Sequence, residues 1–241
     1  RGLGDVYKRQ QLYDRLRKDL FSETEAILQK LMVLLGDFWR PQIQFPMDKA
    51  TTNPLQFLKS YYADHALLIN RLYNPAQPDL GNFSDQDLSS IVPQEISKTY
   101  LSKAPFKSAQ VYALPGQTVT VTRLDQVQDI QVAIQVNSLR NTAVHEFDNL
   151  GYNRPKFVTS TAIPILPGET LTFTHPYGGP IQLRFKQEQA LINTEIELFF
   201  EDVGQHPVWQ SPLDDEAFAS ALLTSPYSWV EAVSYTHLRA H

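Results

Sequence analysis

Apolar residues recur at helical spacing in the first third of the chain. This spacing predicts a helix with one apolar stripe, formed by Ile27, Leu28, Leu31, Leu34, Leu35 and Phe38. The segment Ser22-Glu-Thr-Glu25 directly before the stripe has the S-x-x-E form of a capping box. In a capping box the Ser and Glu side chains satisfy free backbone N–H groups, so we expect this segment to start the helix.

A second helix is predicted to begin at Asn53-Pro54, because Asn is a favoured cap and Pro is tolerated at the first helical position. Leu55, Leu58, Tyr62, Ala66, Ile69 and Tyr73 give it one apolar stripe, and we expect it to stop at Pro75. A linker rich in Pro, Asn and Gly follows. Ser84 and Pro93 then each open a short helical candidate.

Beyond Pro105 the hydrophobic period changes from 3.6 to 2, which is typical of half-buried strands. The alternating runs lie at about 118–122, 130–136, 171–174, 181–185 and 192–200. They are short and separated by Pro and Gly turns, which favours an antiparallel sandwich. A parallel sheet would need crossover helices, and none fits between the runs.

Residues 114–122 (LPGQTVTVT) and 166–174 (LPGETLTFT) are identical at six of nine positions. In each, Pro-Gly supplies the central positions of a type II turn, because Gly accepts a positive φ. The threonines that follow present one polar, β-branched strand face to water. The similarity indicates either a duplicated unit or two independent solutions to the same turn.

The pattern changes again from Gly204. A loop over 206–212 is followed by a helical pattern over 214–223, which begins with acidic residues suited to the positive end of a helix. The predicted fold class is therefore α+β: an N-terminal helical region, an antiparallel β-sandwich and a short C-terminal helix.

Composition excludes several classes of function. The 241 residues include 21 Lys and Arg and 26 Asp and Glu, so the formal net charge is −5. Without a Lys/Arg stripe, this balance argues against binding to nucleic acid. No apolar run approaches the ~20 residues of a membrane span. The chain has no cysteine, which excludes disulfides, thiolate metal ligands and cysteine nucleophiles.

Both ends of the chain look foreign. Residues 1–10 and 233–241 resemble translated sequencing-adaptor sequence, with an ordinary frayed terminus as the alternative. The first residue is Arg, which indicates that processing removed the start or that the chain is a fragment. We therefore do not count the histidines of the C-terminal tail as candidate ligands.

The segment His145-Glu-Phe-Asp-Asn149 lacks only the second His of H-E-x-x-H, the zinc-binding helix of metalloproteases. An Asn carbonyl is a poor zinc ligand, and Gly151 and Pro155 follow at once. A loop between strands is therefore the favoured interpretation.

The other candidates for chemistry are weaker. His65 is expected at a surface or half-buried helix position, and His206 in a packed loop. His175 lies in a Gly- and Pro-rich loop, which either approaches a ligand or only connects strands. The aromatic residues Tyr152, Tyr177, Trp209 and Trp229 either stack on sugars or fill cores and interfaces. Taken alone, these residues indicate no catalytic site.

Several segments, in order, resemble the enhancin-type zinc metallopeptidase module. The family has a V/L-Y-A-x-P-G-x-x-V-T-V opening, a strand with a polar loop, an Arg-Pro and an S-P-Y/F-G-G-x-I-Y-I segment. The similar segments here are 109–121 (AQVYALPGQTVTV), 134–140, 153–155 (NRP) and 174–183 (THPYGGPIQL). Asn70-Arg71 and residues 74–81 resemble more narrowly the immunomodulating-metalloprotease branch.

The resemblance implies a secreted bacterial parent enzyme that cleaves O-glycosylated proteins, including mucins. In the family, zinc is held by H-E-x-x-H and a downstream Glu, C-terminal to the sandwich. No residue here matches that motif, so the resemblance implies a non-catalytic portion of a peptidase, inactive with or without added zinc. Its partners would be the remaining catalytic domain and, through the parent, a mucin-type substrate.

The resemblance implies a helical N-terminal region at 11–103, a β-sandwich subdomain at 104–203 and the start of the catalytic region at 204–232. Tyr177, Gly178, Gly179 and Trp209 are predicted to help shape a substrate groove; no catalytic or metal-binding residue is predicted. The alternative is a carbohydrate-binding or adhesive β-sandwich module without enzymatic activity. A structural spacer without a ligand is also open.

Overall fold

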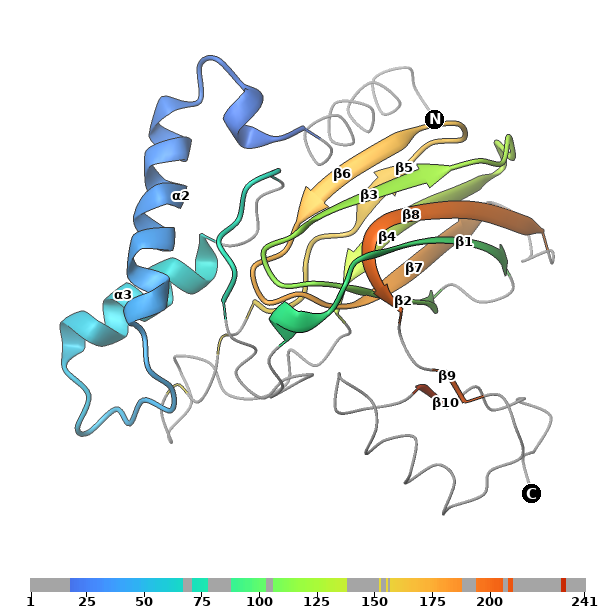
Figure 1. Ribbon diagram of the computed structural model, residues 1–241. Helices are drawn as coiled ribbons and strands as arrows, with labels where there is room; N and C mark the ends of the chain where they lie inside the picture. Colours follow the sequence, from blue (N-terminus) through green and yellow to red (C-terminus); the bar gives the residue numbers. More distant parts are fainter. Residues whose placement is uncertain are drawn as a thin grey trace.

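The computed structural model describes residues 18–66, 71–77, 88–102, 106–137, 152, 155, 157–187 and 194–205, and the backbone of 208–209 and 231–232. In this part of the chain, a small helical region precedes a mostly antiparallel β-sandwich (Figure 1). The predicted α+β architecture is confirmed here. The predicted C-terminal helix and both tails lie outside the described residues.

Two helices form the helical region: α2 (Ile27–Trp39) and α3 (Pro54–His65). The short 3₁₀ turns are η1 (Leu20–Ser22), η2 (Arg40–Gln42) and η3 (Leu88–Ser90). Helix α3 begins as predicted, since Asn53 Oδ1 accepts a hydrogen bond from the Leu55 N–H at 2.8 Å. It ends at His65, well before the predicted stop at Pro75, because residues 71–77 run as non-helical chain toward the sandwich.

The predicted capping box is wrong. Ser22 ends η1, and its hydroxyl donates to the Asp19 carbonyl at 2.7 Å. The cap of α2 is Ala26, four residues further along, and no side chain bonds to the helix start there. A capping box needs its Ser at the cap itself, so the motif matched the sequence but not the helix boundary.

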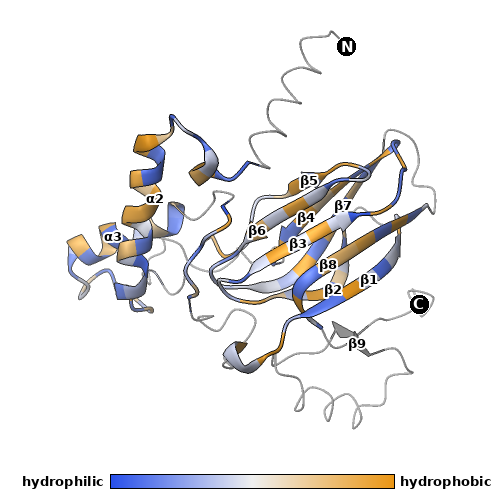
Figure 2. Ribbon diagram, turned by 45° about the horizontal axis from the view of Figure 1, so that its top comes forward, coloured by the Kyte–Doolittle hydropathy of each residue, from blue (hydrophilic) through white to orange (hydrophobic). Residues whose placement is uncertain are grey.

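The apolar stripe predicted on α2 is exposed, and the hydropathy colouring shows the apolar residues of this helix (Figure 2). In the stripe predicted for α3, Leu55, Leu58 and Tyr73 are exposed, Tyr62 and Ala66 are half-buried, and Ile69 lies outside the described residues. The buried residues of α2 are Val33 and Gly36, and those of α3 include Ala63. The two helices approach through small residues, since a Cβ at Gly36 would lie only 2.8 Å from the Ala66 Cβ. The large apolar residues left exposed include Ile27, Leu28, Leu31, Phe38, Leu55 and Leu58.

The sandwich has two layers of four strands. One layer has the order β6-β3-β8-β1, and the other β5-β4-β7-β2. Every pairing is antiparallel, and the layers join where Val203–Gln205 of β8 pairs with Val111–Ala113 of β2. The strands are β1 (Gln94–Leu101), β2 (Phe106–Ala113), β3 (Thr118–Arg123), β4 (Ile130–Val136), β5 (Ile163–Ile165), β6 (Thr170–Thr174), β7 (Gly179–Gln187) and β8 (Glu195–Gln205).

The core lies between these layers. Alternate side chains of β3, β4 and β8 are buried, as the period of two predicts, and fully buried examples are Val121, Ile134, Leu198 and Phe200. The alternating runs in the sequence therefore correspond to strands β3, β4, β6, β7 and β8.

Strand β1 occupies the place of the helical candidate predicted at Pro93, which is a further correction. Only Tyr100 of this strand is buried, so β1 gives almost no alternating signal in the sequence. Its backbone is satisfied by pairing along β8 at the edge of one layer. Strand β1 belongs to the sandwich although it falls within 11–103; the remaining domain boundaries stay a prediction.

The two similar segments of the sequence become neighbours. Strands β3 and β6 pair with each other, so that Thr118 lies opposite Thr174 and Thr122 opposite Thr170. The hydroxyls of Thr122 and Thr170 are 2.9 Å apart. Gly116 (φ +68°) and the equivalent Gly168 (φ +72°) both have the positive φ predicted for their turns.

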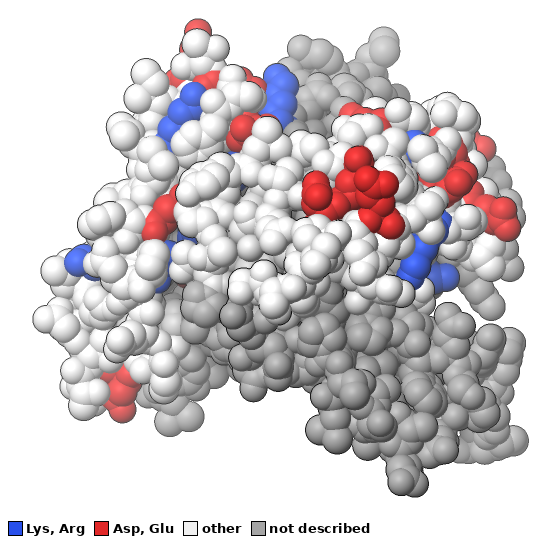
Figure 3. Space-filling view, viewed as in Figure 1, with Lys and Arg blue, Asp and Glu red and all other residues white. Residues whose placement is uncertain are grey.

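Surface charge is uneven on the face seen in Figure 3. Acidic side chains gather over the part of the sandwich near β3 and β8, whereas Lys and Arg are scattered. Among the described residues, no helix is long and apolar enough to cross a membrane.

A short parallel pair, β9 (Val208–Trp209) with β10 (Glu231–Ala232), lies outside the sandwich.

Candidate functional site

Residues 71–77, which we call the strap, connect the helical region to the sandwich. The Leu72 carbonyl accepts a hydrogen bond from the Thr174 hydroxyl at the end of β6. The Gln77 N–H donates to the Pro176 carbonyl at 2.7 Å. The strap is therefore attached to the sandwich near both of its ends.

A buried ion-pair cluster fixes the other side of the strap. Arg71 places Nη1 and Nη2 at 2.5 and 2.7 Å from the two carboxylate oxygens of Asp37 on α2, and Nη2 also donates to Asn74 Oδ1 at 2.7 Å. Arg40 adds a bond to the same carboxylate at 2.9 Å and one to the Ala63 carbonyl at 3.2 Å. The side chain of Arg71 is only 1% exposed and that of Asp37 10%. The cluster thus joins α2, η2, α3 and the strap.

Asp64 on α3 makes a second connection. Its carboxylate accepts hydrogen bonds from the Tyr152 hydroxyl and, at 3.0 Å, from the Phe157 N–H. The Tyr152 backbone in turn pairs with Met47 in both directions, at 2.7 and 2.8 Å. The connection between β4 and β5 is therefore attached to the helical region at Tyr152 and Phe157.

The loop between β6 and β7 depends on two glycines. Gly178 has φ +62°, and a Cβ there would lie 2.4 Å from the Ala113 carbonyl oxygen. Gly179 has φ +132°, and a Cβ there would lie 1.5 Å from Asn137 Oδ1. Asn137 Nδ2 donates to the Gly178 carbonyl at 2.9 Å. These contacts leave no space for a side chain at either glycine.

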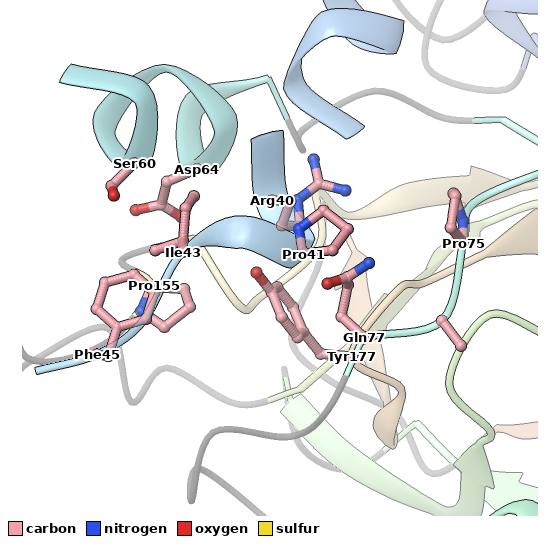
Figure 4. A pocket seen from close by; sticks show the side chains of 11 residues that line it. Arg40, Pro41, Ile43, Phe45, Ser60, Asp64, Pro75, Gln77, Pro155 and Tyr177 are labelled. Atoms are coloured by element: carbon pink, nitrogen blue, oxygen red, sulfur yellow. The ribbon is translucent and has the colours of Figure 1, made fainter. Parts of the chain in front are cut away.

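A cavity of about 300 Å³ lies at this seam between the helical region and the sandwich (Figure 4). That volume is at the lower end of the range of small-molecule pockets. We call it the seam cavity. Its walls are formed by Arg40, Pro41, Ile43, Phe45, Ser60, Asp64, Pro75, Ala76, Gln77, Pro155 and Tyr177.

Burial dominates the titration of the groups beside the seam cavity. It lowers the pKa of His175 to about 3; the charge of Arg40 acts in the same direction, and the nearby Gly178 backbone opposes both. Burial raises the pKa of Tyr177, although Arg40 opposes this effect. His175 is therefore neutral and Tyr177 protonated at neutral pH. A general acid or base works best with a pKa near the working pH, so neither group is suited to that role.

The described residues do not fit a zinc ion. Among them, no three His, Asp or Glu side chains come together closely enough to hold a metal. Neither ring nitrogen of the buried His175 has a well-formed hydrogen bond to a described residue, and no carboxylate contacts it there. We assign no metal ligand in this part of the chain and derive no step through zinc. The segment 145–149 lies outside the described residues.

The structure separates the four predicted groove residues. Tyr177 lines the seam cavity, whereas Gly178 and Gly179 pack behind it against β2 and Asn137. The side chain of Trp209 lies outside the described residues, so substrate contact by this set stays a prediction. Tyr152 and Tyr177 are 0% and 5% exposed. For these two residues, the interpretation that the aromatic side chains fill cores or interfaces is confirmed.

The structure tests the predicted position of His65 but not that of His206. His65 lies half-buried on α3, where its Nδ1 is 2.8 Å from the Tyr61 carbonyl oxygen and its ring packs on Phe157. The predicted surface or half-buried helix position is thereby confirmed. His206 lies outside the described residues.

Sequence reasoning missed most residues of the seam. Asp37, Arg40, Asp64 and Gln77 were not singled out, because their partners lie far away in the chain. One available signal was a charged residue such as Asp37 next to the apolar stripe of a helix. A second was the resemblance carried by Asn70-Arg71 and residues 74–81, which contains Arg71 itself.

Comparison with known proteins identifies related chains. The model of the immunomodulating metalloprotease helical domain matches residues 1–72. A curated immunomodulating metalloprotease from Pseudomonas aeruginosa is 26% identical over 193 residues, which cover 76% of this chain and 21% of that protein. The resemblance to immunomodulating metalloproteases predicted from the sequence is confirmed.

Solved structures agree with the fold. A structure described as IMPa from Pseudomonas aeruginosa in complex with an O-glycopeptide matches with a TM-score of 0.78 and 25% identity. A structure described as IMPa metallopeptidase in complex with T-antigen matches with the same TM-score and 24% identity. Each match covers 97% of this chain and 28% of the solved chain. The chain thus spans about a quarter of the relatives that it resembles.

Proposed function

From the similarity of this chain to immunomodulating metalloproteases, we propose that it is the non-catalytic N-terminal and β-sandwich portion of a secreted bacterial zinc metallopeptidase. The parent acts on O-glycosylated, mucin-type proteins. This portion holds the helical region and the sandwich in a fixed relation, and the remaining catalytic domain of the same polypeptide carries the chemistry.

The observation that carries the proposal is the extent of the structural match. It covers 97% of the chain at a TM-score of 0.78, so it includes the helical region, the seam and the sandwich together. A likeness restricted to the sandwich would be expected for many unrelated β proteins. The bound O-glycopeptide and T-antigen in those structures support an O-glycosylated substrate for the parent.

The seam supports a scaffolding role. Buried ion pairs join α2 to η2 and to the strap. Hydrogen bonds then join the strap to β6, and Asp64 of α3 to the connection between β4 and β5. Interdomain contacts within a chain are often small and polar, and they then permit relative motion. Buried charges with fixed partners oppose such motion, because separating one partner leaves an uncompensated charge. The portion therefore acts as one support for the catalytic domain.

The proposal assigns zinc to the remaining polypeptide. When bound there, zinc would supply a Lewis acid and an activated water for peptide hydrolysis. Reading the gene beyond residue 232 tests this assignment. We expect an H-E-x-x-H motif within about the next hundred residues, the scale of one domain. Its absence, in a gene that continues as an unrelated domain, would reject the proposal.

A second candidate function is a carbohydrate-binding or adhesive module without enzymatic activity. Its original motivation, exposed aromatics, does not hold for Tyr152 and Tyr177, which are buried. The seam cavity is the observation that keeps this candidate open. A glycan array probed with the whole chain tests this candidate. Binding of the chain to selected glycans would support it, and failure to bind any glycan would count against it.

A further inference from the structure

Two buried polar side chains, those of Tyr177 and Gln77, line the seam cavity. Tyr177 is 5% and Gln77 7% exposed, yet neither the Tyr177 hydroxyl nor the Gln77 side-chain amide has a hydrogen-bond partner among the described residues. Both side chains line the cavity, and the Tyr177 hydroxyl points into it (Figure 4). Buried polar groups in native proteins almost always bond to protein, to water or to a ligand. These two groups are therefore available to an occupant.

Most polar atoms of the charged side chains in the cavity wall are engaged elsewhere. The terminal nitrogens of Arg40 bond to Asp37 and to the Ala63 carbonyl, whereas its buried Nε has no partner among the described residues. The two carboxylate oxygens of Asp64 accept from Tyr152 and Phe157. An anionic or cationic ligand would compete with these bonds. The Tyr177 hydroxyl and the Gln77 amide can each donate and accept hydrogen bonds. They therefore suit a neutral ligand with several hydroxyls.

The remaining wall is apolar. Ile43, the ring of Phe45 and the rings of three prolines line the cavity. Small-molecule sites commonly combine such a wall with a few placed polar groups. A pyranose has the matching character, because its C–H face is apolar and its edge carries hydroxyls. The volume of about 300 Å³ suits one ring rather than an extended oligosaccharide.

We propose that the seam cavity is a binding site for one neutral pyranose. The Tyr177 hydroxyl and the Gln77 amide bond to adjacent sugar hydroxyls, and the ring lies against Phe45 and the prolines. This site belongs to the described chain itself. The proposal does not rest on the peptidase activity proposed for the parent.

Ligand-observed NMR titration of the whole chain tests the site. The probes are methyl β-galactopyranoside, methyl α-glucopyranoside and N-acetylgalactosamine, with acetylprolinamide as a neutral probe without sugar hydroxyls. We expect at least one sugar to bind with a Kd on the order of 1 mM or tighter. Tyr177→Phe and Gln77→Leu should each raise that Kd by about 3- to 10-fold, the effect of one net hydrogen bond.

Tyr73→Phe is the matched control, because Tyr73 is 74% exposed and does not line the cavity. It should leave the Kd unchanged, and the melting temperature of every variant checks the fold. Failure of all three sugars to bind up to about 50 mM would overturn the proposal. Equal Kd values for Tyr177→Phe, Gln77→Leu and Tyr73→Phe would also overturn it, as would binding of acetylprolinamide in place of the sugars.

Discussion

Arg71 on the strap places two guanidinium nitrogens on the carboxylate of Asp37 on α2, at 2.5 and 2.7 Å. The two residues are 34 positions apart in the chain, and both side chains are at most 10% exposed. This pair defines the seam, because it fixes the strap to the helical region while Leu72 and Gln77 attach it to the sandwich.

Arg71→Met should destabilise the chain by about 3–5 kcal/mol, because removing one partner of a buried ion pair leaves the other charge uncompensated. Chemical denaturation followed by circular dichroism measures the free energy of unfolding. Lys49→Met removes one positive charge from an exposed position and serves as the control, with an expected change within about 0.5 kcal/mol. A loss below about 1 kcal/mol for Arg71→Met would contradict the structural role of the pair.

Gly179→Ala should destabilise strongly, by about 3 kcal/mol or more, or prevent folding. Its Cβ would lie 1.5 Å from Asn137 Oδ1, in a backbone conformation that L residues rarely adopt. Gly168→Ala is the matched control: it also has a positive φ, but its Cβ would meet only the end of the Gln126 side chain, at 3.2 Å. There the expected loss is about 1–2 kcal/mol. Thermal or chemical unfolding measures both variants. A similar loss of unfolding free energy for the two would contradict the close packing of Gly179 against Asn137.

The outward face of α2 should tolerate polar substitution. Leu28 and Leu31 are 67% and 58% exposed, so Leu28→Gln and Leu31→Gln should each change the free energy of unfolding by less than about 0.5 kcal/mol. Val33 is 1% exposed, and Val33→Ala should cost about 2 kcal/mol through the two lost methyl groups and the space they leave. The opposite ranking would mean that the predicted apolar stripe is buried after all.

Stability should fall as the pH drops below about 6.5, in part because of His175. Its pKa is about 3 in the folded chain against 6.5 as the ordinary value, so between these limits the unfolded chain binds one proton more. The contribution is present above pH 6.5 and is lost toward pH 3, with a slope of about 1.4 kcal/mol per pH unit. His175→Phe should remove this slope between pH 5 and 6.5.

Above about pH 7.5, His175 is neutral in both states, so the stability curves of the wild type and His175→Phe should run parallel there. Urea titrations at a series of pH values provide both comparisons. Identical slopes of the two proteins between pH 5 and 6.5 would show that His175 is accessible to water in the folded chain.

The strands were predictable because their signal is local. Val132 and Ile134 of β4 face the core while Gln131 faces water, and a period of two records this directly. Strand β1 was missed because only Tyr100 is buried in it. The exposure of the helix faces could not be predicted, because apolar periodicity shows that a face is apolar, but not what covers it. Leu31 is exposed in the described chain even though it belongs to the periodic stripe.

The seam could not be predicted from local pattern. Asp37 and Arg71 meet across 34 residues, and Asp64 reaches Phe157 across 93. Charged residues are ordinarily assigned to the surface, and their spacing does not show which distant partner each one meets. Tyr177 was selected for its unusual loop, and it lines a cavity whose other wall comes from residues before position 80 and from Pro155. Only folding brings those segments together.

The most direct measurement is peptidase activity of the polypeptide encoded by the extended gene, compared with that of the 241-residue chain. An O-glycosylated peptide and its unglycosylated counterpart are incubated with each protein, with and without zinc, and the products are identified by mass spectrometry. Our account predicts that the extended protein cleaves the glycosylated peptide and that the 241-residue chain cleaves neither. Zinc-dependent cleavage by the 241-residue chain alone would contradict it.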